Sequence, residues 1–102
     1  MSFIKRYPNI LEAIENSRTL SKGQKSILKV LAQCEKGLPT TSLMKIIGVS
    51  SRQGIHSNIK KLLDREFVVR KKENVYVYEV NEHKMLDIIE TYNQVQEIKI
   101  DK

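Results

Sequence analysis

Cysteine, glycine, proline and histidine are scarce in this sequence of 102 residues, which contains one, four, two and two of them. The lone Cys34 excludes an intrachain disulfide and the cysteine-rich patterns of structural zinc sites. Four glycines are too few for a nucleotide-binding loop in addition to helix ends, and no G-x-S-x-G motif is present. His56 and His83 lie far apart in the sequence. We therefore expect a protein that is not an enzyme and that uses no metal or cofactor.

Long apolar runs are also missing, so we expect neither a membrane span nor a secretory signal. Together with the single cysteine, this favours a cytoplasmic protein. Hydrophobic residues make up 40% of the sequence, which is enough for one compact core if they are well patterned. The length is that of one domain, so we predict a single domain over residues 1–102.

Positive charge is concentrated in the middle of the chain, whose overall net charge is +6. Residues 52–72 include seven basic and two acidic residues, whereas residues 74–102 include three basic and six acidic ones. This asymmetry predicts an anionic partner for the middle of the chain and a different role for its C-terminal part.

The first half of the chain has the pattern of three helices. Pro8 is suited to the first turn of one helix, and Ser21 with Gln24 forms a capping-box pattern for the next. The buried stripe of this second helix comprises Ile27, Leu28, Leu31 and Cys34. We expect Gly37 to end it in a left-handed conformation, and Leu38 to form a very short edge strand before Pro39.

A third and a fourth helix are predicted to follow, separated by a sharp turn. Thr40 or Thr41 is expected to cap the third helix and Gly48 to end it, with Val49 packed into the core. The inward residues of the third helix are expected to be Leu43, Ile46 and Ile47. Ser50 is expected to cap the fourth helix, which runs from about residue 51 to 65. Its buried stripe comprises Ile55, Ile59, Leu62 and Leu63, and its outer face is polar and mostly basic.

A hairpin and a last helix complete the pattern. Residues 67–72 and 75–80 read as two strands joined by a short turn, with Tyr76 and Tyr78 packed on one face. Asn81 is expected to cap a helix over residues 82–98.

Residues 49–68 are similar to the recognition segment of winged-helix regulators, and the MarR-like and ArsR-like groups are the nearest comparison. The resemblance covers residues 21–80. It implies an α+β, mainly α winged helix: a three-helix core, a β-hairpin wing and a C-terminal helix for dimerisation. The Glu66-Phe67 pair departs from the family pattern, which often has a glycine before the first wing strand.

The winged-helix resemblance implies that the fourth helix enters the major groove of double-stranded DNA. Gln53 is suited to adenine and Arg52 to guanine, although Arg52 falls toward the core side of the helix. Lys60 and Lys61 are expected to meet phosphates, as are the wing cations and the start of the third helix. The predicted DNA-binding residues are Thr41, Ser42, Ser51, Arg52, Gln53, His56, Ser57, Lys60, Lys61, Arg70, Lys71 and Lys72.

The last helix has a wider apolar face than a single small domain requires. We expect part of this face to pack against the domain and part against a twofold partner, since its polar residues are mildly acidic and unsuited to DNA. The predicted dimer residues are Met85, Ile88, Ile89, Tyr92 and Val95. The alternative is a helix folded back on its own core.

Three functions fit these patterns. The first is a homodimeric, sequence-specific transcription regulator, most simply a repressor, with no evident small-molecule ligand. The second is a plasmid or viral accessory protein that binds DNA in replication or partition. The third is a winged-helix module that binds an acidic protein, although the hydrogen-bonding residues at the start of the fourth helix favour DNA.

Overall fold

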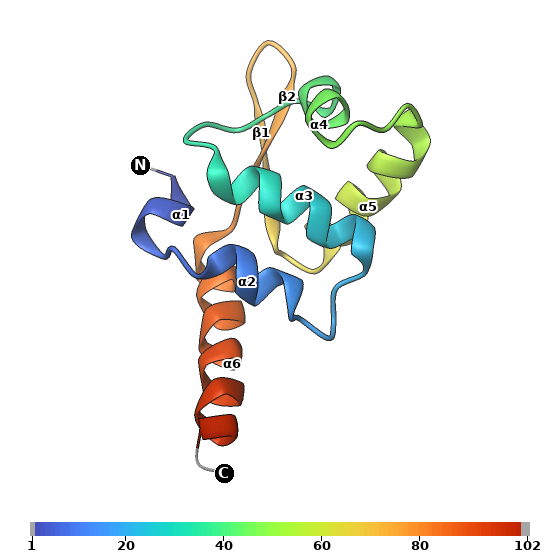
Figure 1. The fold of residues 1–102 in the computed structure, drawn as a ribbon. Coiled ribbons are helices and arrows are strands. Elements are labelled where there is room, and N and C mark those ends of the chain that lie inside the picture. The colour runs from blue at the N-terminus through green and yellow to red at the C-terminus, as the bar shows by residue number, and fades with distance from the viewer. Residues whose placement is uncertain (1, 101–102) are drawn as a thin grey trace.

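The computed structural model describes residues 2–100, with side chains through residue 96. In chain order the elements are α1 (Phe3–Arg6), α2 (Ile10–Glu15), α3 (Lys22–Gln33), α4 (Thr40–Ile47), α5 (Arg52–Asp64), β1 (Val68–Lys72), β2 (Tyr76–Val80) and α6 (Glu82–Ile100). Helix α3 is central and contacts α1, α2, α4, α5 and β2 (Figure 1). This architecture confirms the predicted α+β, mainly α fold.

The core is formed mainly by aliphatic side chains from α2 to α6. The largest fully buried side chains are Ile10, Ile14, Ile27, Leu28, Leu43, Leu62 and Met85. Burying each such side chain stabilises the fold by about 1.5–3 kcal/mol relative to leaving it in water. Helix α1, which the sequence patterns did not predict, adds Phe3 to this core and stacks it on Tyr7 with ring centroids 4.9 Å apart.

Helix α3 begins as predicted and ends differently. Its capping box is present, because Ser21 Oγ accepts from the Gln24 amide and Gln24 Oε1 accepts from the Ser21 amide. Gly37 is not its left-handed stop, since α3 already ends at Gln33 and Cys34 is extended. Gly37 instead lies against β2, where an added Cβ would be 3.2 Å from the Tyr78 carbonyl oxygen.

Cys34 is half-buried rather than part of the core. It follows the last helical residue of α3, and the chain turns away from the buried stripe at this point. Burial raises the pKa of its thiol, so Cys34 is a weaker nucleophile than an ordinary exposed cysteine.

Helix α4 differs from its prediction in its capping residue and in the burial of two apolar residues. Pro39 precedes it without a side-chain cap, so neither Thr40 nor Thr41 is the capping residue. Leu43 is buried as expected, but Ile46 and Val49 are exposed. Ile46 is rotated by about 100° from Ile47 on the helix and therefore faces away from α3 and α5. Val49 lies in the turn after α4, where its amide donates to the Met44 carbonyl and its side chain stays outside.

Strands β1 and β2 form an antiparallel hairpin in which Val68 pairs with Val80, Arg70 with Tyr78, and Lys72 with Tyr76. The predicted short edge strand is confirmed, because Leu38 and Tyr78 exchange both backbone hydrogen bonds, at 3.0 and 2.9 Å. The base of the hairpin is thereby joined to the segment that leads into α4.

At the end of α5, Glu66 occupies the turn position where the family often has a glycine. Its φ is +65°, the left-handed conformation that a glycine usually adopts at this position. The Phe67 amide donates to the Leu62 carbonyl and the Glu66 amide to the Leu63 carbonyl, which is the hydrogen-bond pattern of a Schellman motif. The turn therefore has the geometry of a glycine turn with a glutamate in it.

Replacing Glu66 with glycine is expected to raise the free energy of unfolding by about 0.5–1 kcal/mol. The left-handed backbone costs a residue with a Cβ roughly 1–2 kcal/mol, and the greater entropy that glycine loses on folding offsets part of this gain. Urea unfolding measures the change. Asp64→Gly, at a helical and exposed position nearby, is the control and should lower stability by a similar amount. A Glu66→Gly variant as destabilised as Asp64→Gly would contradict the strain at Glu66.

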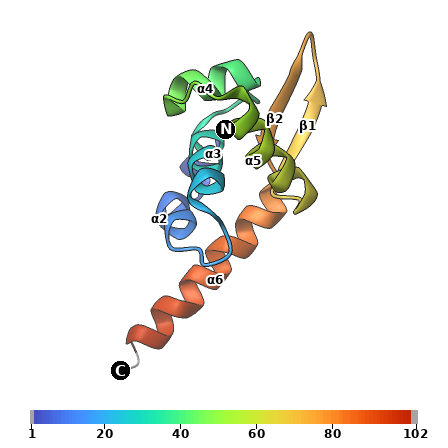
Figure 2. The ribbon, with the colours of Figure 1, turned by 90° about the vertical axis from the view of Figure 1, so that its right-hand side faces the viewer.

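Helix α6 begins at the predicted cap, since Asn81 Oδ1 accepts from the His83 amide at 3.2 Å. It packs against α2 and then continues away from the body, which gives the molecule dimensions of 50 × 27 × 23 Å (Figure 2). No helix in the described part of the chain has both the length and the apolar character that a membrane crossing requires.

The predicted dimer residues of α6 lie in two different environments. Met85, Ile88 and Ile89 are buried in the core of their own chain, with Met85 at 0% exposure. Tyr92 is half-buried and Val95 is exposed. Part of the apolar face is therefore folded back on the domain.

Candidate nucleic-acid interface

The turn between α4 and α5 directs the start of α5 outward. Gly48 ends α4 in the left-handed conformation with φ of +84°, as predicted. Ser51, rather than Ser50, caps α5, because its Oγ accepts from the Gly54 amide at 3.1 Å. The helix accordingly begins at Arg52, one residue later than expected. Its first three residues are exposed to solvent.

Helix α5 separates an apolar face from a polar one, as the sequence predicts. Ile55, Ile59 and Leu62 are buried against the core. The exposed polar residues are Arg52, Gln53, His56, Ser57, Lys60, Lys61 and the acidic Asp64 at the end of the helix. Arg52 is thus on the accessible side of the helix, although its position on a helical wheel placed it near the core. These side chains offer cationic groups and hydrogen-bond donors and acceptors on one surface.

His56 connects α5 to the start of α4. Its Nε2 lies 3.1 Å from Thr40 Oγ1, and Thr40 is buried. This contact fixes the orientation of the two helices and uses one ring nitrogen of His56. Thr41 is exposed and Ser42 half-exposed in the same first turn of α4, where the backbone amides have no side-chain cap from Pro39.

The three cations of β1 have different environments. Arg70 Cζ lies 4.3 Å and Lys72 Nζ 4.6 Å from the centroid of the Tyr76 ring. Lys71 points to the other face of the hairpin and pairs with Glu79, with Nζ and Oε2 3.2 Å apart. Tyr78 is buried as expected, whereas Tyr76 is exposed and carries the two cations.

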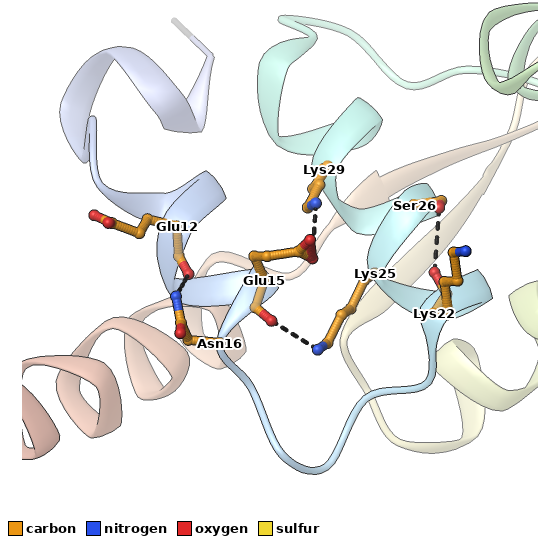
Figure 3. Close-up of polar contacts among 7 residues, drawn as sticks. All are labelled: Glu12, Glu15, Asn16, Lys22, Lys25, Ser26 and Lys29. Carbon is orange, nitrogen blue, oxygen red and sulfur yellow. Dashed lines mark hydrogen bonds and ion pairs between the residues drawn. The ribbon is translucent and has the colours of Figure 1, made fainter.

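Two lysines of α3 contact Glu15 of α2 and are not part of the α5 surface (Figure 3). Lys25 Nζ donates to the Glu15 main-chain carbonyl at 2.7 Å, and Lys29 Nζ pairs with the Glu15 carboxylate at 2.9 Å. The hydrogen bond and charge of Lys29 lower the pKa of the Glu15 carboxyl below its ordinary value. Lys5 and Arg6 likewise pair with Glu35 and Glu82. Within residues 2–96, by contrast, no carboxylate pairs with Arg52, Lys60 or Lys61.

The candidate site residues lie at one end of the molecule. Both views show α4, α5 and the hairpin at the end remote from the C-terminal part of α6 (Figures 1 and 2). We use the term basic face for the exposed polar residues of α5 together with Arg70, Lys72 and Tyr76. Sequence reasoning assigned Tyr76 only to packing. Its position opposite Lys72 in the hairpin register was the available signal for its contact with the cations.

A groove of about 420 Å³ lies at the other end, between α6 and the segment after α2. Its apolar lining includes Ala13, Phe67 and Ile88, and Tyr92 and Val95 lie along α6. Partial burial and the neighbouring Glu12 carboxylate raise the pKa of the Tyr92 phenol. No cluster of potential metal ligands is found among the residues that the structure describes.

Comparison with known proteins identifies the fold through structure rather than sequence. No protein-family model matches the chain, and no curated protein sequence matches it. A MarR family transcription regulator superposes with a TM-score of 0.61 at 13% identity, covering 94% of this chain and 66% of the regulator. The chain thus spans just under two thirds of that protein.

Two further solved structures agree. The adhesin competence repressor AdcR from Streptococcus pyogenes has a TM-score of 0.58 at 21% identity, and the superposition covers 95% of this chain and 75% of the AdcR chain. A protein from the archaeon Sulfolobus tokodaii has a TM-score of 0.56 at 17% identity, and the superposition covers 94% of this chain and 99% of the archaeal chain. Together with the helix-turn-helix of α4 and α5 and the following hairpin, these matches show that the chain has the winged helix-turn-helix fold of MarR-family transcription regulators.

Proposed function

We propose that this protein is a DNA-binding transcription regulator that contacts double-stranded DNA through its basic face. The observation that carries the proposal is the exposed surface of α5, where cations without a carboxylate partner lie beside hydrogen-bonding side chains. DNA affinity comes largely from neutralising phosphates, and base choice from polar side chains in the major groove.

Roles follow from position along α5. Gln53 and Ser57 are exposed near its start, where a recognition helix meets base edges. Arg52 is also accessible and can pair with guanine. Lys60 and Lys61 lie further along the helix and are expected to meet the sugar-phosphate backbone. Ser51 still has a hydroxyl proton to donate while its oxygen caps the helix.

The start of α4 supplies a further backbone contact in this proposal. The amides at Thr41 and Ser42 point out of an uncapped helix N-terminus, which favours a phosphate oxygen. His56 is held by Thr40 and is expected to orient α5 more than to read a base.

A homodimeric repressor is the specific form that we propose. AdcR, which shares the fold, is named as a repressor. The exposed Val95 and the half-buried Tyr92 leave an apolar strip on α6 after the inner residues have packed on their own chain. A second copy that covers this strip and the adjacent groove would place two recognition helices about 34 Å apart, one turn of DNA. Light scattering at micromolar concentration tests the dimer, and a monomeric mass would contradict it.

Selection of bound duplexes from a random pool tests the function most directly. A homodimeric regulator is expected to enrich a near-palindrome with half-sites about one helical turn apart. Enrichment without symmetry would favour the replication or partition role over the dimeric regulator. Absence of duplex binding at low salt would contradict both and favour a protein partner, for which the exposed Ile46 and Val49 beside the turn are the supporting observation.

Replacing Gln53 with alanine is expected to change sequence preference more than overall affinity. A lost bidentate contact to adenine costs about 1–3 kcal/mol of discrimination at one base pair, whereas the phosphate contacts remain. The measurement is fluorescence anisotropy on the selected duplex and on its single-base variants. Ser26→Ala on α3 is the control and should leave the preference unchanged, since its hydroxyl bonds within α3 to the Lys22 carbonyl. An equal loss of affinity on every duplex would contradict base reading by Gln53.

A further inference from the structure

The proposed function assigns no individual role to the exposed ring of Tyr76 in the hairpin. Its side chain is 45% exposed, although an aromatic ring is costly to leave in water. The antiparallel register places Lys72 directly opposite Tyr76, and alternation along β1 brings Arg70 to the same face. The ring is therefore covered in part by two cations, at 4.3 Å for the Arg70 guanidinium carbon and 4.6 Å for the Lys72 nitrogen.

Stacking changes what these cations can do. An arginine that lies on an aromatic face keeps its in-plane N–H groups free, and those groups match a phosphate oxygen pair. Free arginine and lysine side chains have large rotamer entropy, which they lose on binding. A cation that the ring already holds loses less of it, and each such contact at an exposed site favours the held position about two- to five-fold.

Lys71 is held in the opposite way. It lies on the other face of the hairpin, and the Glu79 carboxylate is 3.2 Å from its ammonium group. Strand alternation therefore separates the three cations. Arg70 and Lys72 contact the Tyr76 ring, whereas Lys71 is neutralised by Glu79.

We propose that Tyr76 is the positioning residue of the wing, holding Arg70 and Lys72 as a pair that binds the phosphate backbone of DNA, while Lys71 makes no equivalent contact. The proposal rests on the function proposed above. It identifies which hairpin residues bind the backbone, and it makes Arg70 and Lys72 more important than Lys71.

A set of hairpin variants tests this with a fluorescein-labelled duplex of mixed sequence, titrated over a range of salt. Tyr76→Leu is expected to weaken binding by about three- to ten-fold while leaving the salt slope unchanged, because both charges remain. Tyr76→Phe keeps the ring and should bind like the wild type. Arg70→Gln and Lys72→Gln should each reduce the salt slope by about one, and Lys71→Gln by much less.

Two further readouts separate positioning from a general structural role. In an Arg70→Gln/Lys72→Gln background, Tyr76→Leu should have no additional effect on affinity, whereas a misfolded hairpin would weaken binding further. Without DNA, the side-chain protons of Arg70 and Lys72 should show upfield ring-current shifts in proton NMR. These shifts should persist in Tyr76→Phe and disappear in Tyr76→Leu.

Three results would overturn the inference while duplex binding by the wild type persists. They are wild-type affinity in Tyr76→Leu, a loss in Tyr76→Phe as large as that in Tyr76→Leu, or a Lys71→Gln effect equal to that of Lys72→Gln. A wild-type protein that binds no duplex would instead overturn the proposed function, and the NMR shifts would then still report whether the ring holds the cations.

Discussion

Replacing Met85 with alanine is expected to lower the free energy of unfolding by about 2–5 kcal/mol, a large share of the roughly 5–15 kcal/mol typical of a domain. Met85 has no exposed surface and lies in the core shared by α6 and the rest of the domain. Alanine would leave a cavity that the neighbouring helices cannot fill. Thermal unfolding should show a Tm lower by on the order of 10–20 °C.

The adjacent Leu86 provides a matched control on the same helix. It is 38% exposed, so Leu86→Ala should change the unfolding free energy of the monomer by less than about 1 kcal/mol. If α6 forms the proposed dimer, Val95→Ala should weaken dimerisation, because Val95 is exposed and lines the groove. Light scattering upon dilution measures this change. Equal destabilisation of Met85→Ala and Leu86→Ala at low protein concentration would contradict the packing of α6 described above.

The double substitution Lys60→Gln/Lys61→Gln is expected to weaken duplex binding on the order of 10–100-fold near 0.1 M salt. Each lysine that neutralises a phosphate releases about one counterion, so the salt slope should fall by about two for each bound subunit. The loss should be similar for all duplex sequences, since phosphate contacts carry no base information. Anisotropy titrations at several salt concentrations measure both quantities.

Lys25→Gln/Lys29→Gln is the control for net charge. It removes the same two charges from α3, where both lysines contact Glu15 of α2 rather than the basic face. Its affinity for DNA should remain within about three-fold of the wild type. A loss as large as that of the α5 variant would show that binding follows total charge and not the surface of α5.

The local signals in the sequence predicted most of the elements. The Ser21 and Gln24 capping box, the left-handed Gly48 and the cap at Asn81 are present as expected. These features succeed because they depend on hydrogen bonds within a few residues of each other. The polar face of α5 was predictable for a related reason, since its buried stripe fixes the helix orientation.

Features that depend on distant segments were not predictable. Gly37 looked like a helix stop, but its position reflects the close approach of β2, about 40 residues later. Ile46 and Val49 were expected inside, but Ile46 lies on the outer side of α4 and Val49 in the turn after it, and both remain exposed. Apolar character alone does not show which face of a short helix will find a partner.

The same limit applies to the candidate site. A run of three basic residues in β1 was predicted as one group, because sequence alone does not show what lies across the hairpin. The paired strand supplies Tyr76 to two of these cations and Glu79 to the third. Knowledge of the register, with Lys72 opposite Tyr76, would have been enough to separate them.

The two backbone hydrogen bonds between Leu38 and Tyr78 have a mechanical consequence. They connect β2 to the residue just before Pro39 and α4, while the side chain of Asn81, directly after β2, donates to the Glu66 carbonyl at the end of α5. The hairpin is thus hydrogen-bonded both to the segment that leads into α4 and to the end of α5. Any movement transmitted through α6 should turn the helix-turn-helix and the hairpin together as one unit, so that the two proposed DNA contacts would be made or broken in the same step.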